Sequence, residues 1–378
     1  MTSFMKARLS PGSYESSTLP ELSKILIISP SLKLGGIERA SSNLANEFVR
    51  AGHSVFFFCI FRQKPFFPLD KSVEIIEPRF KKLQRLNVIN APFRIRRAVK
   101  KIKPDAILVF NKFYGAQTLL GLAGLKHKVF VSERASPFYR FPPALEMFNK
   151  LVFSVFKPSG VVAQTHFAAN KQKDYYKKGT SIKVIPNALR EIKQFDIQKR
   201  QVVLGVGRLS DHLKGFDLLI DAWSQVNNKQ WKLILTGRME ENPIIEEKVR
   251  KYGLEKNIEF VGRINDIDLL YAEAGVFVIP SRSEGFPNAL VEAMASGLPV
   301  ISFNFHAGVE EIITKNLNGI LIENGNTKKL AEAIDILISD ETERNRLGKN
   351  AKEIKNRLEG KKISSEVLDF ILSDKSFV

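Results

Sequence analysis

The chain alternates short apolar runs with stretches whose apolar residues recur at helical spacing. Each run is rich in Val, Ile, Leu or Phe and ends at a polar or glycine turn, which is typical of a buried strand. In the first half these runs are residues 24–30, 55–61, 105–110, 128–132 and 161–164. In the second half they are residues 202–206, 232–236, 258–261, 276–280, 299–302 and 319–322. Strands that alternate with helices form parallel sheets covered on both faces, so the pattern predicts an α/β fold with two Rossmann-like, doubly wound domains.

The alternation of predicted strands and helices is interrupted at residues 185–187, and we expect the domain boundary there. A first domain would cover residues 21–186 and a second domain residues 187–360. Residues 361–378 are predicted to form a helix that packs back on the first domain. Residues 1–20 contain Ser and Pro but no apolar segment typical of a secretion signal, so we expect a disordered lead-in. Two such domains leave a cleft between them, and ligands bind at the carboxyl ends of the strands.

The composition narrows the class of protein. The chain has 378 residues, of which 44% are apolar and 26% charged, as in globular domains. No apolar run approaches the roughly 18 residues that a membrane-spanning helix requires. Cys59 is the only cysteine, so an internal disulfide is impossible. A reducing, cytoplasmic compartment is therefore the simplest expectation.

Positive charge is concentrated in the first half of the chain. The net charge of the whole chain is +18. Residues 1–190 contain 32 Lys and Arg against 11 Asp and Glu, a net charge of +21, and the remainder carries −3. This asymmetry indicates that the first half faces an anionic partner, which is a membrane surface, a phosphorylated substrate or nucleic acid.

Basic residues after one strand of the second half favour a diphosphate. Gly207 and Arg208 directly follow the predicted strand 202–206, and Lys214 lies further along the same loop. Glycine lets the backbone approach a ligand closely, while Arg offers a bidentate fork and Lys a mobile charge. A surface loop with two solvated cations would have the same sequence, so both explanations stay open.

Two glutamates flank the start of a predicted helix. Glu284 lies in the loop after the strand 276–280, and Asn288 is the predicted N-cap of the helix 289–296. The free N–H groups at such a helix start favour an anion. Glu292, one turn into the helix, can accept hydrogen bonds from the hydroxyls of one sugar, and Glu284 from those of another. An acidic loop before an acidic first turn is the structural alternative.

Glycines also follow two other strands of the second half, in Gly237-Arg238 and Gly262-Arg263. They can frame a flat base through backbone contacts, or they are ordinary turns. Asp266 and Asp268 have the spacing of a metal-binding triplet, but a helix start explains them better, so no metal site is predicted.

Together these motifs resemble the retaining GT-B glycosyltransferases of family 4. The resemblance rests on Gly207-Arg208-Leu209, Lys214-Gly215-Phe216, Glu284-Gly285-Phe286-Pro287-Asn288, Glu292-Ala293-Met294-Ala295 and Gly297-Leu298-Pro299-Val300-Ile301. Two glutamates separated by seven residues are that family's signature. In the first half, the likeness includes Gly35-Gly36, Glu38-Arg39 and Ile185-Pro186-Asn187.

The resemblance implies a role for each matching residue. Arg208 and Lys214 would stabilise the leaving nucleoside diphosphate, Glu292 would bind the ribose, and Glu284 would hold the donor sugar. The remaining binding residues implied are Gly36, Gly207, Gly262, Arg263, Gly285, Phe286, Pro287 and Asn288. Members of this family usually need no metal, so no cofactor is expected beside the nucleotide-sugar donor. The donor guessed from the resemblance is a UDP-hexose or a UDP-N-acetylhexosamine.

The acceptor side carries weaker signals. Glu133 and Arg134 follow the strand 128–132 and should face the cleft, where many relatives have a histidine. A structural salt bridge and a catalytic contact are both open for these two residues. His166 can also face the cleft. His306 departs from the residue usual in relatives, and Glu311 is expected to have a packing role.

Residues 79–103 mix basic and apolar side chains, as an interfacial helix on anionic lipid does. Residues 138–156 are rich in Phe and could add apolar contact, although packing on the first sheet is the favoured explanation for them. With the charge asymmetry, this pattern favours a protein bound peripherally to the inner face of a membrane and a lipid-linked glycan acceptor.

Three functions are consistent with these observations. The preferred one is a glycosyltransferase that extends a lipid-linked glycan in the assembly of surface polysaccharide or glycoconjugates. The second is a soluble GT-B enzyme of another reaction, such as a sugar-nucleotide epimerase or a glucan-extending transferase. Nucleic-acid binding is third, because the basic half contains no recognised module and no aromatic-basic platform, and no nucleic-acid partner is expected.

Overall fold

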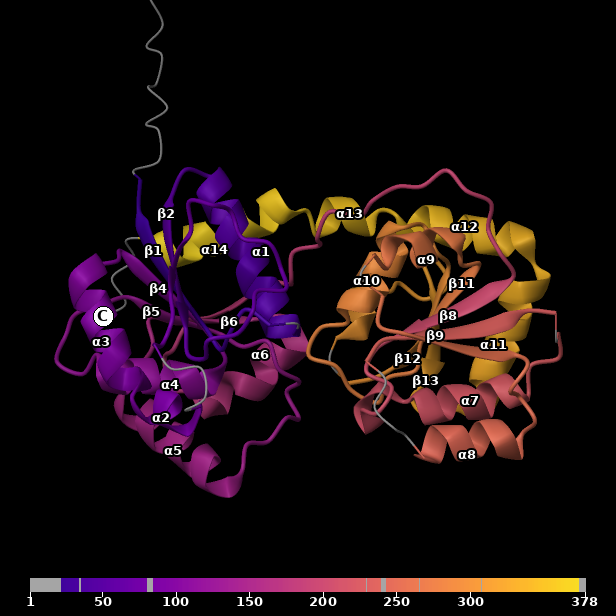
Figure 1. Cartoon of the computed structure of the whole chain (residues 1–378), viewed down its shortest axis with the longest axis horizontal. Helices are drawn as coiled ribbons and strands as arrows, with labels where there is room; N and C mark the ends of the chain where they lie inside the picture. Colours follow the sequence, from indigo (N-terminus) through magenta and orange to yellow (C-terminus); the bar gives the residue numbers. More distant parts are fainter. Residues whose placement is uncertain are drawn as a thin grey trace, which may run out of the picture.

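The computed structural model describes residues 22–33, 35–79, 84–228, 230–238, 243–264, 266–306 and 308–373. It contains two parallel sheets, one in each half of the chain, and the halves lie side by side (Figure 1). This confirms the predicted α/β fold with two doubly wound domains. The predicted lead-in at residues 1–20 and the last five residues lie outside the described residues.

The first sheet has seven parallel strands in the order β3-β2-β1-β4-β5-β6-β7. Their bounds are β1 (Lys24–Ser29), β2 (Ser54–Cys59), β3 (Glu74–Ile76), β4 (Ala106–Phe110), β5 (Val129–Ser132), β6 (Gly160–Ala163) and β7 (Ile182–Val184). Strands β3 and β7 were not predicted. Each is a three-residue edge strand without a fully buried side chain, so neither has the continuous apolar run that marks a central strand.

The second sheet has six parallel strands in the order β10-β9-β8-β11-β12-β13. Their bounds are β8 (Val202–Val206), β9 (Lys232–Thr236), β10 (Ile258–Gly262), β11 (Val276–Ile279), β12 (Val300–Asn304) and β13 (Ile320–Glu323). All of them coincide with predicted apolar runs to within two residues. The order changes direction between β8 and β11, and such a switch point is where parallel sheets bind ligands.

Helices connect the strands on both faces of each sheet. In the first half they are α1 (Gly36–Arg50), α2 (Gln84–Ile89), α3 (Ala91–Ile102), α4 (Lys112–Gly121), α5 (Pro143–Val155), α6 (His166–Gln172) and the 3-10 turn η1 (Lys173–Tyr175). In the second half they are η2 (His212–Lys214), α7 (Phe216–Ser224), α8 (Pro243–Lys251), α9 (Asp268–Glu273), α10 (Asn288–Ala295), η3 (Val309–Glu311), α11 (Thr327–Ser339), α12 (Glu341–Ala351), α13 (Ile354–Arg357) and α14 (Gly360–Leu372). No helix among the described residues is both long and apolar enough to cross a bilayer.

Strand β1 shows how the first sheet holds its two layers of helices. Ile25 and Ile27 pack with α1 and α14 on one face, and Leu26 and Ile28 pack with α3, α4 and α5 on the other. Successive side chains of a strand point to opposite faces, so an uninterrupted apolar run buries both.

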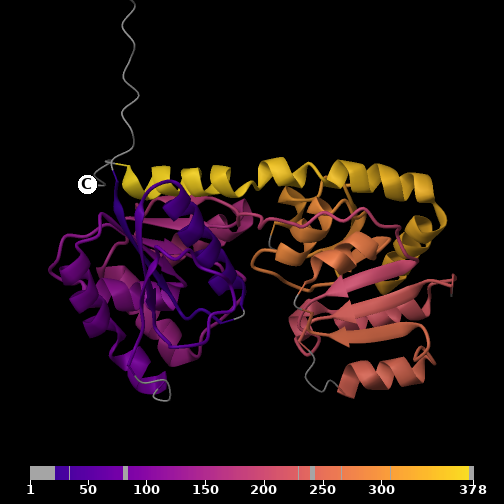
Figure 2. The same ribbon diagram turned by 45° about the horizontal axis from the view of Figure 1, so that its top comes forward.

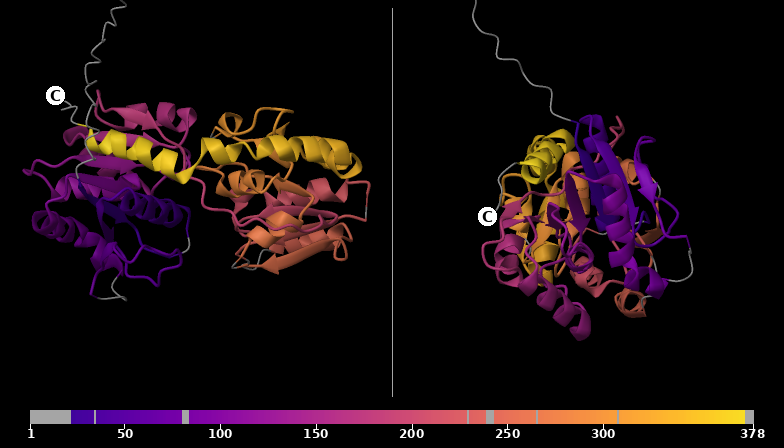
Figure 3. Two further views of the ribbon diagram at one scale, coloured as in Figure 1. Left: turned by 90° about the horizontal axis from the view of Figure 1, so that it is seen from above. Right: turned by 90° about the vertical axis from the view of Figure 1, so that its left-hand side faces the viewer.

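Helix α14 belongs to the end of the chain but packs on the first half. It contacts α1 and β4, and the ring of Phe370 meets that of Phe130 edge-on at 5.3 Å between centroids. Figures 2 and 3 show the last helices running along one side of the molecule from the second half to the first. The chain therefore passes between the halves twice, and Leu189 N–H donates to Leu358 C=O at 2.8 Å where the two passages meet.

Candidate active site

Lys214 and Glu284 meet at the carboxyl ends of β8 and β11, the two neighbouring strands at the switch point. The Lys214 ammonium donates to both carboxylate oxygens of Glu284 at 2.7 Å, and Ser281 Oγ donates to one of them at 2.6 Å. The pair is mostly buried. The structure thus brings two predicted site residues into direct contact, as a cation and an anion beside the cleft.

Gly215 makes this contact possible. Its φ of +67° is left-handed, and a Cβ there would lie 1.9 Å from the carbonyl oxygen of Pro280. Only glycine can therefore occupy this position. The turn η2 consequently lies on the backbone of the loop after β11, and Arg282 N–H donates to Leu213 C=O at 2.8 Å.

Arg208 lies at the rim of the same loop. Its guanidinium bonds to Asp211 at 2.5 Å, and 64% of the side chain is exposed, so it contacts neither Glu284 nor Glu292. Of the predicted cations, Lys214 is held in place and Arg208 is solvated.

The glycines predicted to follow strands line up along the sheet edge. A Cβ at Gly237 would lie 1.7 Å from the carbonyl oxygen of Gly207, and Gly237 N–H donates to Gly262 C=O at 2.8 Å. The backbones after β8, β9 and β10 are therefore in contact, with the exposed Arg263 side chain just beyond. This gives the second half a continuous backbone edge next to Lys214.

The loop that leads into α10 differs from the prediction at Asn288. Pro287 takes the cap position without a side-chain hydrogen bond, and α10 begins at Asn288. The Asn288 side chain points instead to Asn187, whose amide donates to it at 3.1 Å. The prediction of an N-cap was wrong because a residue 101 positions away competes for that side chain.

The other residues of this loop have separate surroundings. Phe286 is buried in the core between the halves. A Cβ at Gly285 would lie 2.6 Å from the carbonyl oxygen of Arg134, so the loop rests on the backbone of the first half. Across the cleft, Gly36 faces Asn288, and a Cβ on Gly36 would lie 3.9 Å from its amide nitrogen.

Glu292 is buried and already has cationic partners. It forms ion pairs with Arg39, which reaches across from α1, and with Arg190 at 3.3 Å. Tyr271 Oη lies 3.4 Å away, and Arg190 also bonds to Asp268 at 2.9 Å. Neither Arg39 nor Arg190 was among the predicted site residues. Asp268 begins α9, as predicted, and its carboxylate belongs to this ion-pair network.

Arg134 connects the two halves. Its Nε donates to Ser132 Oγ at 2.7 Å and its Nη1 to Asn187 Oδ1 at 2.5 Å. Burial lowers the pKa of Arg134 to about 10. The arginine thus bonds to Ser132 and Asn187, and neither Arg134 nor Glu133 forms a salt bridge among the described residues.

Glu133 is a buried carboxylate at the end of β5, with 4% of its surface exposed. Ala135 N–H donates to Oε1 at 3.3 Å, while Oε2 has no hydrogen-bond partner among the described residues. Burial raises the pKa of Glu133, and the nearby Lys112 opposes that shift. A carboxyl group held in this way favours its protonated form.

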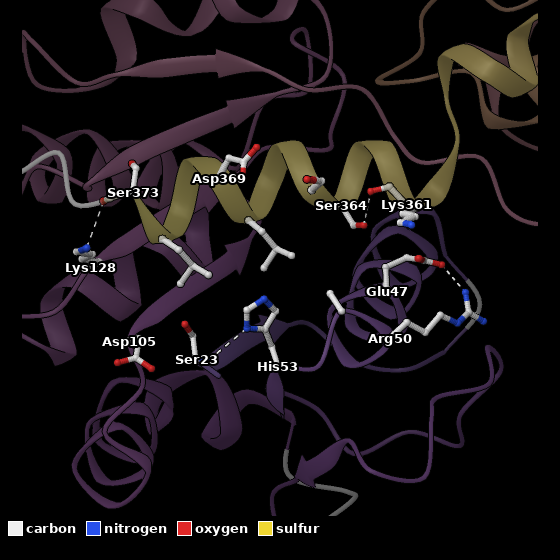
Figure 4. Close-up of a pocket in the computed structure, with 14 residues that line it drawn as sticks. Ser23, Glu47, Arg50, His53, Asp105, Lys128, Lys361, Ser364, Asp369 and Ser373 are labelled. Atoms are coloured by element: carbon white, nitrogen blue, oxygen red, sulfur yellow. Dashed lines mark hydrogen bonds and ion pairs between the residues drawn. The ribbon is translucent and has the colours of Figure 1, made fainter. Parts of the chain in front are cut away.

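A cavity of about 1040 Å³ lies elsewhere, between α14 and the first sheet (Figure 4). Ser23, His53, Asp105 and Lys128 line it, and each directly precedes a strand. It is therefore at the amino ends of the strands, whereas parallel sheets bind ligands at the carboxyl ends. Ser23 N–H donates to His53 Nδ1 at 3.3 Å, and burial lowers the pKa of this histidine.

Two sequence profiles of known protein families match this chain. The sequence profile of Glycosyltransferase Family 4 matches residues 34–190, and that of Glycosyl transferases group 1 matches residues 188–354. The chain belongs to the family 4 glycosyltransferases. The two profiles meet where the chain first passes between the halves, so each domain of this glycosyltransferase is recognised separately.

Named relatives cover most of the enzyme. An uncharacterized glycosyltransferase of Haemophilus influenzae is 28% identical over 81% of this chain and 87% of its own. The GalNAc-alpha-(1->4)-GalNAc-alpha-(1->3)-diNAcBac-PP-undecaprenol alpha-1,4-N-acetyl-D-galactosaminyltransferase of Campylobacter jejuni is 25% identical over 93% of this chain and 99% of its own. HepE of Anabaena, solved with UDP and glucose, superposes with a TM-score of 0.73 at 20% identity, covering 92% of this chain and 98% of that one. The last comparison shows that the glycosyltransferase has the GT-B fold.

The predicted donor residues can be tested by binding of UDP. We expect Lys214→Ala, Arg208→Ala and Glu292→Ala each to weaken UDP binding by about 10- to 100-fold, since a hydrogen bond to a charged group contributes roughly 1.5–3 kcal/mol. Isothermal titration calorimetry measures the effect, with the exposed Lys328→Ala as the control. Unchanged affinity in all three variants would contradict the assignment.

The buried Glu133 predicts a dependence of stability on pH. Because its pKa is raised in the folded enzyme, its contribution to stability is present at low pH and is lost as the pH rises through the folded pKa. Glu133→Gln mimics the protonated form, so its melting temperature should match the wild type near pH 4, below the ordinary pKa of a glutamate, and exceed it increasingly as the pH rises. Thermal melts across this range measure the gap, and the exposed Glu246→Gln should show none. A gap independent of pH would rule out titration of Glu133.

Proposed function

We propose that this enzyme is a retaining glycosyltransferase that transfers a hexose or N-acetylhexosamine from its UDP derivative to a lipid-linked glycan. The observation that carries the proposal is the Lys214–Glu284 pair at the switch point, beside the start of α10. HepE, of the same fold, was solved with UDP and glucose. The Campylobacter relative is named for transfer to an undecaprenol-diphosphate glycan, which supports an acceptor of that class.

In the proposed reaction, the bond between the anomeric carbon and the diphosphate oxygen breaks while the acceptor hydroxyl bonds to the same face of the sugar. The proton of that hydroxyl passes to the leaving phosphate. Lys214, Arg208 and the N–H groups at the start of α10 stabilise the negative charge that develops on the diphosphate. These groups supply the charge that a metal ion would otherwise supply, so we propose that transfer needs no metal.

Glu292 has to change partners when the donor binds. Its carboxylate is held by Arg39 and Arg190, and a ribose whose hydroxyls bond to it would replace at least one of them. Arg39 comes from α1, directly after the Gly35-Gly36 turn. Its release from Glu292 would put another cation at the cleft next to the diphosphate.

The outer surface of α2 and α3 supports docking on an anionic membrane. Leu86, Ile89 and Phe93 are exposed, with Phe93 at 76%. Five exposed basic residues lie on the same helices or directly after α3, and these are Arg85, Arg97, Lys100, Lys101 and Lys103. The other two arginines of α3 bond to backbone carbonyl groups. Arg94 donates to those of Cys59 and Ile60, and Arg96 donates to those of Gly121 and Ala123. Residues 80–83 of the predicted interfacial segment lie outside the described residues.

Helix α5 adds exposed apolar side chains to this side of the domain, although its sequence favoured packing on the first sheet. It packs through Val152 and Phe153, but Met147, Leu151 and Val155 are exposed at a spacing of four residues. Helices α3, α4 and α5 are neighbours on one face of the first sheet. The basic and apolar surface of α2 and α3, together with the exposed apolar residues of α5, would place a lipid-linked glycan close to the cleft.

Transfer can be tested with four UDP-sugars (glucose, galactose, N-acetylglucosamine and N-acetylgalactosamine) and undecaprenyl-diphosphate-linked glycans in buffer with EDTA. We expect one pair to react, with an α-linked product, and Lys214→Ala to lower kcat by about 100- to 1000-fold, as loss of an electrostatic contact in the transition state does. Mass spectrometry and NMR of the product measure transfer and linkage. A β-linked product, or transfer that EDTA abolishes, would refute the corresponding part of the proposal.

Membrane docking can be tested by sedimentation with vesicles of phosphatidylglycerol and phosphatidylethanolamine. Each base near an anionic surface contributes about 1 kcal/mol, so reversal of four should weaken binding by about 1000-fold. The variant carries Arg85→Glu, Arg97→Glu, Lys100→Glu and Lys101→Glu. The matched control carries Arg250→Glu, Lys251→Glu, Lys328→Glu and Lys349→Glu on exposed positions of the second half. Equal release of both variants would mean that net charge, and not this surface, drives binding.

A further inference from the structure

Three aromatic rings from both domains meet across the cleft. Phe138 lies in the loop after β5, Phe167 in the first turn of α6, and His306 in the loop after β12. The Phe138 centroid is 5.8 Å from that of Phe167 and 6.3 Å from that of His306. Phe167 and His306 are stacked, with centroids 6.2 Å apart and planes inclined by 17°. All three follow carboxyl ends of strands, so the cluster belongs to the cleft.

A contact between the domains holds the rings in register. The Glu311 carboxylate, from the second domain, accepts hydrogen bonds from the backbone N–H groups of His166 at 3.1 Å and Phe167 at 3.4 Å. Gly308 lies directly against Thr165, since a Cβ on it would come within 2.7 Å of that side chain. The predicted packing role of Glu311 is thus a cap on a helix of the other domain. The ring cluster therefore lies beside a direct contact between the two domains.

The cluster keeps a large aromatic surface in solvent. Phe138 is 49% exposed, His306 is exposed and Phe167 is partly exposed. If the rings served only to hold the domains together, burial of this surface would be the favourable arrangement. Exposed aromatic side chains beside a few polar groups are typical of a ligand site.

The ring cluster lies next to the place proposed for the donor sugar. Ser136, two residues before Phe138, contacts Ser283 across the cleft with 2.8 Å between the hydroxyl oxygens. Ser283 directly precedes Glu284. Two residues span at most about 7 Å, so the backbone at Phe138 is about one sugar unit away from the loop that carries Glu284.

We propose that Phe138, Phe167 and His306 form the subsite that binds a pyranose ring of the acceptor glycan through its apolar face. This rests on the proposed function and names the contact that positions its acceptor. The faces of aromatic rings carry partial negative charge, and the axial C–H groups of a pyranose carry partial positive charge, so the two stack. Because the rings come from both domains, closure assembles the subsite, and acceptor binds best to the closed enzyme.

The subsite can be tested by saturation-transfer NMR with the methyl α-glycosides of glucose, galactose, N-acetylglucosamine and N-acetylgalactosamine. Titrations are run with and without UDP, and UDP binding of each variant is followed by thermal shift. We expect at least one glycoside to receive saturation on one face of its ring. Phe138→Ala and Phe167→Ala should weaken its binding at least tenfold, while Phe138→Trp retains it. The exposed Leu269→Ala on α9 serves as the control.

UDP binding separates failure of this proposal from failure of the proposed function. Weaker glycoside binding with an unchanged UDP thermal shift is the expected result. The proposal is overturned if no glycoside binds under either condition, or if both alanine variants bind it as the wild type does. The proposal is also overturned if the alanine variants lose both the UDP thermal shift and glycoside binding, because the rings would then act only in domain closure. If wild-type enzyme shows no UDP shift, the donor assignment fails, and the titrations without UDP still decide the subsite.

Discussion

Asn187 lies where the chain first passes between the domains, and its buried side chain is shared by both. Its oxygen accepts a hydrogen bond from Arg134 and its amide donates to Asn288. A buried polar group without a partner costs about 1–3 kcal/mol, and more when it is charged. A shift of the domains at this point would break the hydrogen bond of Asn187 to Arg134 or the one to Asn288, and the contacts of Gly285 and Ser283 with the first domain depend on the same alignment.

Much of the fold could be predicted because short local sequence patterns determine it. The central strands are continuous apolar runs, as burial on both faces requires. The glycines after strands were informative for the same reason: Gly215 and Gly237 each lie against a carbonyl oxygen of a neighbouring loop, where no side chain fits. The Lys214–Glu284 pair follows from these turns, because each of its residues is fixed by the strand before it.

The rest of the site depends on contacts between distant parts of the chain. Arg39 is 253 residues from Glu292, and Arg190 is 102 residues from it. Nothing in the spacing of either arginine reveals the glutamate as its partner. The ring cluster was hidden in the same way, because Phe138 and His306 become neighbours only when two separately folded sheets face each other. One signal was present for Arg39, which follows Gly36 closely and therefore had to lie near the cleft.

The two passages of the chain between the domains lie side by side, joined by the hydrogen bond between Leu189 and Leu358. Two domains that are connected at one place can still rotate relative to each other about a hinge axis through that place. Sliding and twisting would stretch one passage against the other. Rotation would then change the interface least beside this axis, where Asn187 lies and where the Glu311 carbonyl accepts a hydrogen bond from Arg357 at 2.6 Å.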